Sequence, residues 1–199
     1  MTRRRIIEPG KTWALSRRTT RRYFLLNPDD ARTLERCYWY CLAVAAQRYG
    51  ILVHAGCLMS THSHEVVTDV RGELPRFLQE FHRLLALTTK AFRGWPGEVF
   101  DKRSTGQHEL LTPEATIEAL AYLISNPVEA MAVRYAKGWP DIIELRLEMP
   151  TALDLDYGTE LAQARIAERV RAREHRAWQE SKRTGIAFVG ARRLRAFNA

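Results

Sequence analysis

A pair of neighbouring apolar runs, 51–59 and 62–69, sets the fold class of this 199-residue chain. Both runs are rich in β-branched residues and only a short polar turn separates them, a pattern that predicts two adjacent strands. The second run begins with His62, Ser63 and His64. Successive side chains on a strand alternate between its faces, so the two histidines are expected on one side, about 7 Å apart at Cα. Their rings could then converge on one metal ion, the alternative being two half-exposed histidines on an edge strand.

Hydrophobic periodicity predicts an α+β fold. The expected elements are, in order, a strand at 12–19, a helix at 30–48, the two strands named above, a helix at 73–93, a short strand at 97–102 and a helix at 112–126. Strands and helices in this order favour a sheet with helices on one face. A further half-buried strand is indicated at 141–149, and the arginine-rich stretch 160–183 predicts a long exposed helix beside the core or on DNA.

The helix expected at 112–126 carries a tyrosine and an asparagine on one face. It starts at a threonine cap followed by a proline, both favoured at helix N-termini. Tyr122 and Asn126 are four residues apart, so they share a face, which lies nearly opposite the apolar stripe. Pro127 disfavours helical geometry at the residue before it, so the helix is expected to end or kink at Asn126. The alternative is an exposed tyrosine and an asparagine that only terminates a helix.

Taken together, these side chains point to phosphoryl transfer. A tyrosine hydroxyl has a pKa near 10 and is a poor nucleophile at neutral pH, unless a cation polarises the group that it attacks. Two imidazoles and one amide oxygen, from His62, His64 and Asn126, supply three ligands to a divalent ion and leave positions for water and a phosphate oxygen. The combination indicates phosphoryl transfer to Tyr122.

Two segments resemble the REP-associated tyrosine transposases, the insertion-sequence-200-like group within the single-tyrosine His-hydrophobic-His (HUH) transposase superfamily. Residues 57–64 are similar to the family's Met-Pro/Ser-Asn-His-x-His, and residues 122–130 to its Tyr-Ile-x-x-Asn-Pro-Val-x-Ala-Gly. The resemblance covers roughly residues 11–140. It implies a ferredoxin-like antiparallel sheet with helices on one face, a catalytic-tyrosine helix and a basic helical C-terminal extension. The expected division is a nuclease domain at 1–150 and the extension at 151–199.

The resemblance also implies a function, namely metal-dependent nicking and strand transfer of single-stranded DNA. His62, His64 and Asn126 would hold Mg²⁺ or Mn²⁺, and Tyr122 would attack a DNA phosphodiester to form a 5′-phosphotyrosine link. The implied substrate is hairpin or palindromic repeat DNA. The implied state is a monomer rather than a homodimer, in the cytoplasm of a bacterium and associated with its nucleoid.

Some positions depart from the family pattern. Ser63 stands where the family has a bulky apolar residue, and Thr61 replaces its asparagine. Ser63 is expected to face away from the metal ligands, because side chains alternate along a strand. The alternative function is therefore a domesticated or inactive DNA-binding regulator that recognises hairpin DNA without cleaving it. A metal-dependent RNA or cyclic-nucleotide phosphoesterase is a weaker reading, because a second His-x-Ser/Thr unit is missing.

Charge agrees with a nucleic-acid partner. The formal net charge is +8, with 31 basic and 23 acidic residues, and much of the excess is clustered arginine. Arg17, Arg18, Arg21 and Arg22 form one such cluster and are expected to contact DNA phosphates. The alternative is a basic surface that only faces solvent.

Membrane insertion and export are not expected. The longest uncharged apolar run, 37–46, is too short to span a bilayer. The twin arginines at 21–22 are followed by polar residues where an export signal needs an apolar stretch. The three cysteines, Cys37, Cys41 and Cys57, are expected to be reduced core residues.

Overall fold

The sheet of this protein is four-stranded and antiparallel, in a computed structural model that describes residues 8–103, 105–139 and 160–189. The strands are β1 (Lys11–Arg18), β2 (Ile51–Met59), β3 (His62–Asp69) and β4 (Gly106–Glu109). Their spatial order is β2-β3-β1-β4, and β3 pairs with both β1 and β2. With one helix between β1 and β2 and another between β3 and β4, this is the ferredoxin-like arrangement. The expected α+β fold is confirmed.

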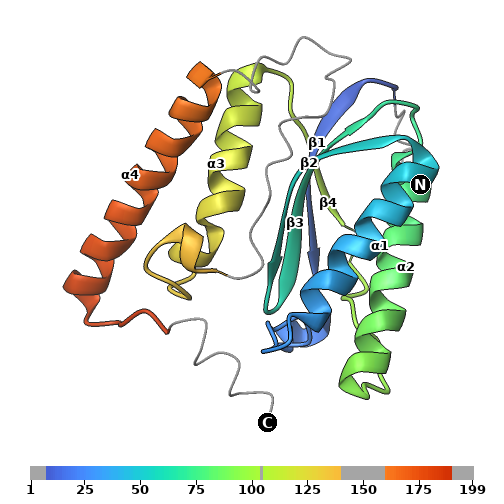
Figure 1. The fold of residues 1–199 in the computed structure, drawn as a ribbon, viewed down its shortest axis with the longest axis horizontal. Helices are drawn as coiled ribbons and strands as arrows, with labels where there is room; N and C mark the ends of the chain where they lie inside the picture. The colour runs from blue at the N-terminus through green and yellow to red at the C-terminus, as the bar shows by residue number, and fades with distance from the viewer. Residues whose placement is uncertain (1–7, 104, 140–159, 190–199) are drawn as a thin grey trace.

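The helices lie on both sides of the sheet. They are α1 (Thr33–Tyr49), α2 (Leu74–Arg93), α3 (Pro113–Glu129) and α4 (Glu160–Thr184). In Figure 1, α1 and α2 cover one face of the sheet, α3 covers the other, and α4 lies outside α3. The helices of the ferredoxin-like core are thus on one face, and the helix that carries Tyr122 is on the opposite one.

Each face of the sheet has its own apolar core. The core under α1 and α2 includes the fully buried side chains of Leu15, Tyr38, Leu58, Phe77 and Phe81. The core under α3 includes Cys57, Val66, Leu120, Ala121 and Leu123, and α4 adds Ala162 and Ile166 to it. Burying one large apolar side chain contributes roughly 1.5–3 kcal/mol. Since the side chains of β2 and β3 alternate, both cores hold these two strands in one register.

The prediction of a strand at 97–102 is wrong. Only an isolated bridge forms there, between Phe100 and Thr19, while the paired edge strand is β4, which follows a few residues later. Val99 and Phe100 have the apolar side chains that suggested a strand, but these side chains fill the core instead. The sequence of β4, Gly-Gln-His-Glu, has no apolar alternation because it lies at the exposed edge of the sheet.

The helix that carries Tyr122 was expected to end or kink at Asn126. The helix does not end there and continues through Pro127 to Glu129. A proline inside a helix removes one hydrogen bond and crowds the carbonyl four residues earlier. Here Pro127 lies in the last turn, and the backbone N–H of Ala130 still donates to the Asn126 carbonyl at 2.9 Å. Burial of Pro127 and of Val128, which is fully buried, offsets the lost hydrogen bond.

The long basic helix predicted at 160–183 is confirmed as α4, whereas the strand predicted at 141–149 and the boundary at 150 lie outside the described residues. Within the described ranges, no helix combines the length and the apolar character that crossing a membrane requires. Cys41 and Cys57 are buried, Cys37 is half-buried, and all three are free thiols.

The half-buried His82 predicts a loss of stability at acid pH. It lies on α2 against Phe81 and Phe100, and burial, followed by the charge of Arg17, lowers its pKa from 6.5 to about 3. Between these two pH values the unfolded chain binds a proton that the folded chain does not, so stability falls as the pH falls. The loss is about 1.4 kcal/mol per pH unit, or roughly 2 kcal/mol between pH 6.5 and 5.

Urea unfolding of the wild type and of His82→Leu, from pH 5 to 7.5, tests this expectation. The substitution introduces an apolar side chain of similar size, so the fold should be retained. The difference in unfolding free energy between the two proteins should change by about 2 kcal/mol in favour of the variant as the pH falls to 5. Parallel curves would contradict a neutral His82 in the folded protein.

Candidate active site

His62 and His64 lie side by side on the face of β3 that α3 covers. Their ring centroids are 4.8 Å apart and the ring planes are nearly perpendicular, at 87°. The Thr61 hydroxyl is 3.0 Å from the His62 Nδ1, and the His64 ring is hydrogen-bonded to the backbone of Leu15. Such partners restrict the orientation of an imidazole ring.

Both imidazoles are kept neutral by their surroundings. Burial, followed by the positive charge of Arg18, lowers the pKa of His62 below its usual value. Burial and the neighbouring His62 lower the pKa of His64 to about 4. A neutral imidazole has a free lone pair, which is the form that binds metal ions.

Helix α3 places Asn126 and Tyr122 against the histidines. The Asn126 side chain is hydrogen-bonded to His62, and the Tyr122 ring centroid is 5.7 Å from that of His64, with the ring planes at 88°. Tyr122 is 40% exposed, as expected for this face of the helix, whereas Asn126 is buried at 6%. The sequence therefore placed Asn126 wrongly, since this residue faces the sheet.

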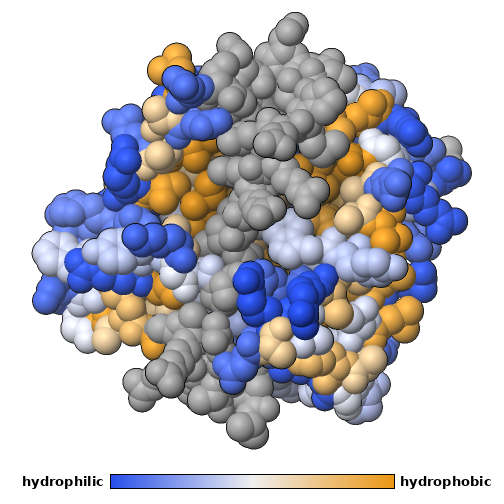
Figure 2. Space-filling model, viewed as in Figure 1, coloured by the Kyte–Doolittle hydropathy of each residue, from blue (hydrophilic) through white to orange (hydrophobic). Residues whose placement is uncertain are grey.

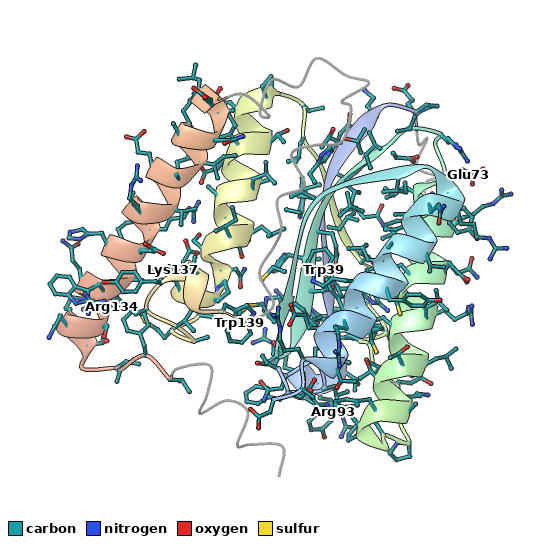
Figure 3. The ribbon with its side chains drawn as sticks, viewed as in Figure 1. Trp39, Glu73, Arg93, Arg134, Lys137 and Trp139 are labelled. Carbon is teal, nitrogen blue, oxygen red and sulfur yellow. The ribbon has the colours of Figure 1, made fainter. Side chains whose placement is uncertain are left out.

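The position of α3 on the sheet is set by packing on both sides of Tyr122. Leu120, Ala121 and Leu123 are buried against the strands. Just after α3, the indole N–H of Trp139 donates to the Leu58 carbonyl of β2 at 2.9 Å. Figure 3 shows Trp139 between the end of α3 and the sheet. These contacts hold the phenol of Tyr122 close to the histidines.

The donor set fits a divalent cation in chemistry. Two neutral imidazoles and the oxygen of Asn126 are three uncharged ligands, which leave coordination positions open for water and phosphate oxygen. Among the described residues, no group of three or more His, Cys, Asp or Glu side chains is placed to hold a metal. His62 and His64 would therefore need the amide of Asn126 as their third protein ligand.

Of the two departures from the family pattern, Ser63 does not touch the candidate metal donors, whereas Thr61 touches one of them. Ser63 is fully buried on the opposite face of β3 from the two histidines, where Glu65 accepts a hydrogen bond from the Tyr38 hydroxyl at 3.0 Å. Thr61 contacts His62 through its own hydroxyl. The small Ser63 side chain leaves room for this polar arrangement behind the sheet.

A cavity of about 520 Å³ lies where β1 ends. Its lining residues are Ser16, Arg17, Arg18, Arg21, Arg22, Asp101, Arg103 and Gly106. Five of them are arginines and a single one is acidic, so the cavity has a strong positive potential that attracts phosphate groups. The four arginines expected to contact DNA are thus brought together, although their role in binding DNA stays a prediction.

The cavity adjoins the histidine pair. Arg18 is the partner of His62 in the β1–β3 register, and the charges of Arg18 and Arg22 both lower the pKa of His62. Arg17 has a different position, since its guanidinium lies over the Phe100 ring at 5.3 Å and donates to the Arg103 carbonyl. Arg18 and Arg22 are therefore the cavity arginines whose charges act on His62.

The backbone of the arginine cluster is strained. Arg21 and Arg22 have φ angles of 48° and 57°, in the left-handed region that residues other than glycine rarely adopt. Each such residue costs of the order of 1–3 kcal/mol, and strain of this kind is concentrated at functional sites. Thr19, which is fully buried, holds the segment in place through hydrogen bonds from its hydroxyl to the carbonyls of Tyr23 and Thr61.

Sequence reasoning missed two arginines of this region. Arg103 follows β3 by more than thirty residues and enters the cavity only because the chain returns beside β1. Arg173 of α4 lies over the Tyr122 ring, with its Cζ 5.5 Å from the ring centroid. The equal four-residue spacing of Arg165, Arg169 and Arg173 could have indicated that α4 presents one basic line to a neighbour.

Comparison with known proteins bears on the fold. No protein-family model matches the sequence, and no curated protein is similar enough to it to count as a relative. The structure of a REP-associated tyrosine transposase bound to a REP hairpin is similar, with a TM-score of 0.59 and 16% identity over 81% of this chain and 93% of that one. A protein of Deinococcus radiodurans R1, provisionally described as a transposase, gives a TM-score of 0.42 and 19% identity over 63% of this chain and 97% of that one.

The first of these likenesses confirms the expected fold. It extends over nearly the whole of the REP-associated transposase and over most of this chain, so the two proteins share an architecture. An identity of 16% leaves the roles of individual residues open. Those roles depend on the geometry around His62, His64, Tyr122 and Asn126.

Proposed function

We propose that this protein is a metal-dependent tyrosine nuclease and strand transferase that acts on single-stranded hairpin or palindromic repeat DNA. The observation that carries the proposal is the convergence of four side chains from two distant segments. His62 and His64 come from β3, Tyr122 and Asn126 come from α3, and the tyrosine ring contacts His64. The alternative, an inactive DNA-binding regulator, does not require a tyrosine at this position.

In the proposed reaction Tyr122 is the nucleophile. Its hydroxyl oxygen forms a bond to the phosphorus of a DNA phosphodiester, and the bond from that phosphorus to the 3′ oxygen breaks. The phenol proton passes to solvent, and the departing 3′ oxygen takes up a proton to become a hydroxyl. One ester replaces another, so no external energy source is needed and the reverse attack by a 3′-hydroxyl completes strand transfer.

His62, His64 and Asn126 are the proposed holders of the divalent cation. When bound there, the cation would supply Lewis-acid polarisation of the scissile phosphate. Two of these three donors are nitrogens, and Mg²⁺ binds mainly to oxygens, so the donor set favours Mn²⁺ over Mg²⁺. We therefore expect the reaction to be faster with Mn²⁺.

The arginine cavity is the proposed path of the DNA backbone next to the scissile phosphate. Arg18 and Arg22 line the cavity and also act electrostatically on His62, so a strand that lies in the cavity would pass the histidine pair. The similar transposase is described as bound to a REP hairpin, which supports hairpin DNA as the substrate class. All four site residues come from one chain, which supports a monomer as the working unit.

Incubation with end-labelled hairpin DNA and Mn²⁺, followed by denaturing electrophoresis, tests the function. The expected product is a protein–DNA adduct that resists denaturation, with Tyr122 identified by mass spectrometry as the modified residue. Unlabelled duplex DNA without a hairpin is the matched competitor and should compete poorly. A shifted native band without any covalent product would overturn the proposal and favour the regulator.

The arginine cavity predicts a salt-dependent loss of DNA binding. Replacement of both Arg21 and Arg22 by alanine removes two charges from the cavity and keeps a Cβ atom at both left-handed positions, so the strain of the turn is unchanged. For single strands, each lost phosphate contact reduces the slope of log K against log salt by about 0.7, so a decrease of about 1.4 is expected. Fluorescence anisotropy from 50 to 300 mM NaCl measures the slope.

Arg76→Ala is the matched control for this measurement. Arg76 is an exposed arginine on α2, on the opposite side of the sheet, and its ion pair is with Glu73. Its removal lowers the net charge without changing the cavity, so the slope should stay near that of the wild type. An equal decrease in Arg76→Ala would mean that DNA senses only the overall charge.

A further inference from the structure

Helix α4 meets α3 along a line of opposite charges. Arg165 and Arg169 of α4 both form ion pairs with Glu114, and Arg169 also pairs with Glu118 at 3.1 Å. Arg173 pairs with Glu118 and with Glu129. The three arginines follow one another on α4 at four-residue intervals. Glu114, Glu118 and Tyr122 have the same spacing on α3, so the two rows of side chains run side by side. In Figure 2, the outer edge on the α4 side is largely hydrophilic.

Arg173 differs from the other arginines of this line because it also reaches the proposed nucleophile. Its Cζ lies over the Tyr122 ring, 5.5 Å from the centroid, a distance at which cation–π attraction is appreciable. Its side chain is 15% exposed, compared with 30% for Arg169 and 42% for Arg165. Partial burial lowers the pKa of its guanidinium, but the hydrogen bonds to Glu129 and Glu118 outweigh that effect and raise it. The charge of Arg173 is therefore permanent and fixed in place.

We propose that Arg173 is a positioning residue, which holds the phenol ring of Tyr122 in the orientation needed for attack on DNA. The ring has His64 of β3 and Arg173 of α4 as neighbours, so two elements outside α3 restrict its rotation. Glu118 and Glu129 in turn restrict the guanidinium from two directions. This inference rests on the proposed function of Tyr122 and assigns a role to α4, which contributes no metal ligand.

The physical reason lies in the exposure of the tyrosine. A side chain that is 40% exposed can adopt several rotamers, and each nonproductive one keeps the hydroxyl away from the phosphate. A contact of cation–π strength shifts such an equilibrium by roughly 5- to 10-fold. Lysine carries the same charge, but it lacks the flat group that covers the ring and bonds two carboxylates at once.

The order of the Tyr122 ring can be measured without DNA or metal. The protein is labelled with 3-fluorotyrosine, and the ¹⁹F resonance of residue 122 is assigned by its disappearance in Tyr122→Phe. In Arg173→Ala and Arg173→Lys, this resonance should shift and narrow, as a ring that moves freely would. Arg169→Ala is the matched control, because Arg169 also bridges two glutamates on α3, one turn earlier. In Arg169→Ala, the ¹⁹F resonance of residue 122 should be the same as in the wild type.

Single-turnover formation of the DNA adduct supplies the second measurement. Arg173→Ala and Arg173→Lys should react about 5- to 10-fold more slowly, with a DNA dissociation constant within twofold of the wild type. Arg169→Ala should react at the wild-type rate. If Arg169→Ala reacts as slowly as the Arg173 variants, Arg173 only helps to dock α4 on α3. If the Arg173 variants lose DNA affinity to the same extent as they lose rate, Arg173 is a phosphate contact. Either result, or an unchanged ¹⁹F spectrum, overturns the inference. A wild type that forms no adduct refutes the proposed function instead, while the ¹⁹F spectra still decide the position of the ring.

Discussion

Tyr122→Phe should abolish the covalent adduct with hairpin DNA while leaving the fold and the binding of DNA intact. The substitution removes only the hydroxyl and keeps the ring, so the contacts with His64 and Arg173 remain. Loss of a nucleophile costs far more than loss of an orienting group, and we expect a decrease of at least about 10³-fold in adduct formation. A change at this half-exposed position should alter the unfolding free energy by no more than about 0.5 kcal/mol.

Tyr135→Phe provides the control. Tyr135 is exposed to a similar degree, at 47%, and its ring also has an arginine over it, with the Cζ of Arg134 5.2 Å from the centroid. Figure 3 shows Arg134 near the end of α4, away from the sheet that carries the histidines. The control variant should form the adduct at the wild-type rate. An adduct that persists in Tyr122→Phe would show that another group is the nucleophile, and the proposed chemistry would fail.

The sequence allowed the strands and helices of the core to be predicted because each has a strong hydrophobic period. Strands β2 and β3 begin and end where the apolar runs do, since each contributes side chains to two cores. The edge strand β4 was missed for the opposite reason. It lies at the margin of the sheet, so packing does not select apolar residues there and no periodic signal remains.

The sequence pointed to the four residues of the candidate site but not to the geometry between them. Spacing placed Tyr122 and Asn126 on one helix face, and alternation placed the histidines on one strand face. Local rules could not predict that Asn126 is buried, because its surroundings come from β3. Nor could they predict that Arg173 covers Tyr122, because this contact depends on how α4 packs against α3. Contacts between distant segments are decided by tertiary packing, which no local pattern contains.

Replacement of either histidine by alanine should remove the metal site. In His62→Ala or His64→Ala, one of three proposed protein ligands is lost, and the remaining two leave the ion mostly held by water. Removal of a mere outer-shell partner typically costs 10- to 100-fold in metal affinity, so loss of a direct ligand should cost at least about 100-fold. The same variants should form the DNA adduct at least about 100-fold more slowly, with Mg²⁺ and with Mn²⁺. Electron paramagnetic resonance of free Mn²⁺ measures the binding directly, without any DNA present.

His108→Ala is the matched control for the metal experiment, since His108 is an exposed histidine on β4 of the same sheet. It should bind Mn²⁺ as the wild type does. Circular dichroism of each variant separates loss of the ion from loss of the fold, which matters because His64 is half-buried under α3. Asn126→Ala should weaken binding less than either histidine variant, because water can replace an amide oxygen more readily than an imidazole nitrogen. Wild-type affinity for Mn²⁺ in both histidine variants would contradict the site, because no other protein donor is proposed to replace them.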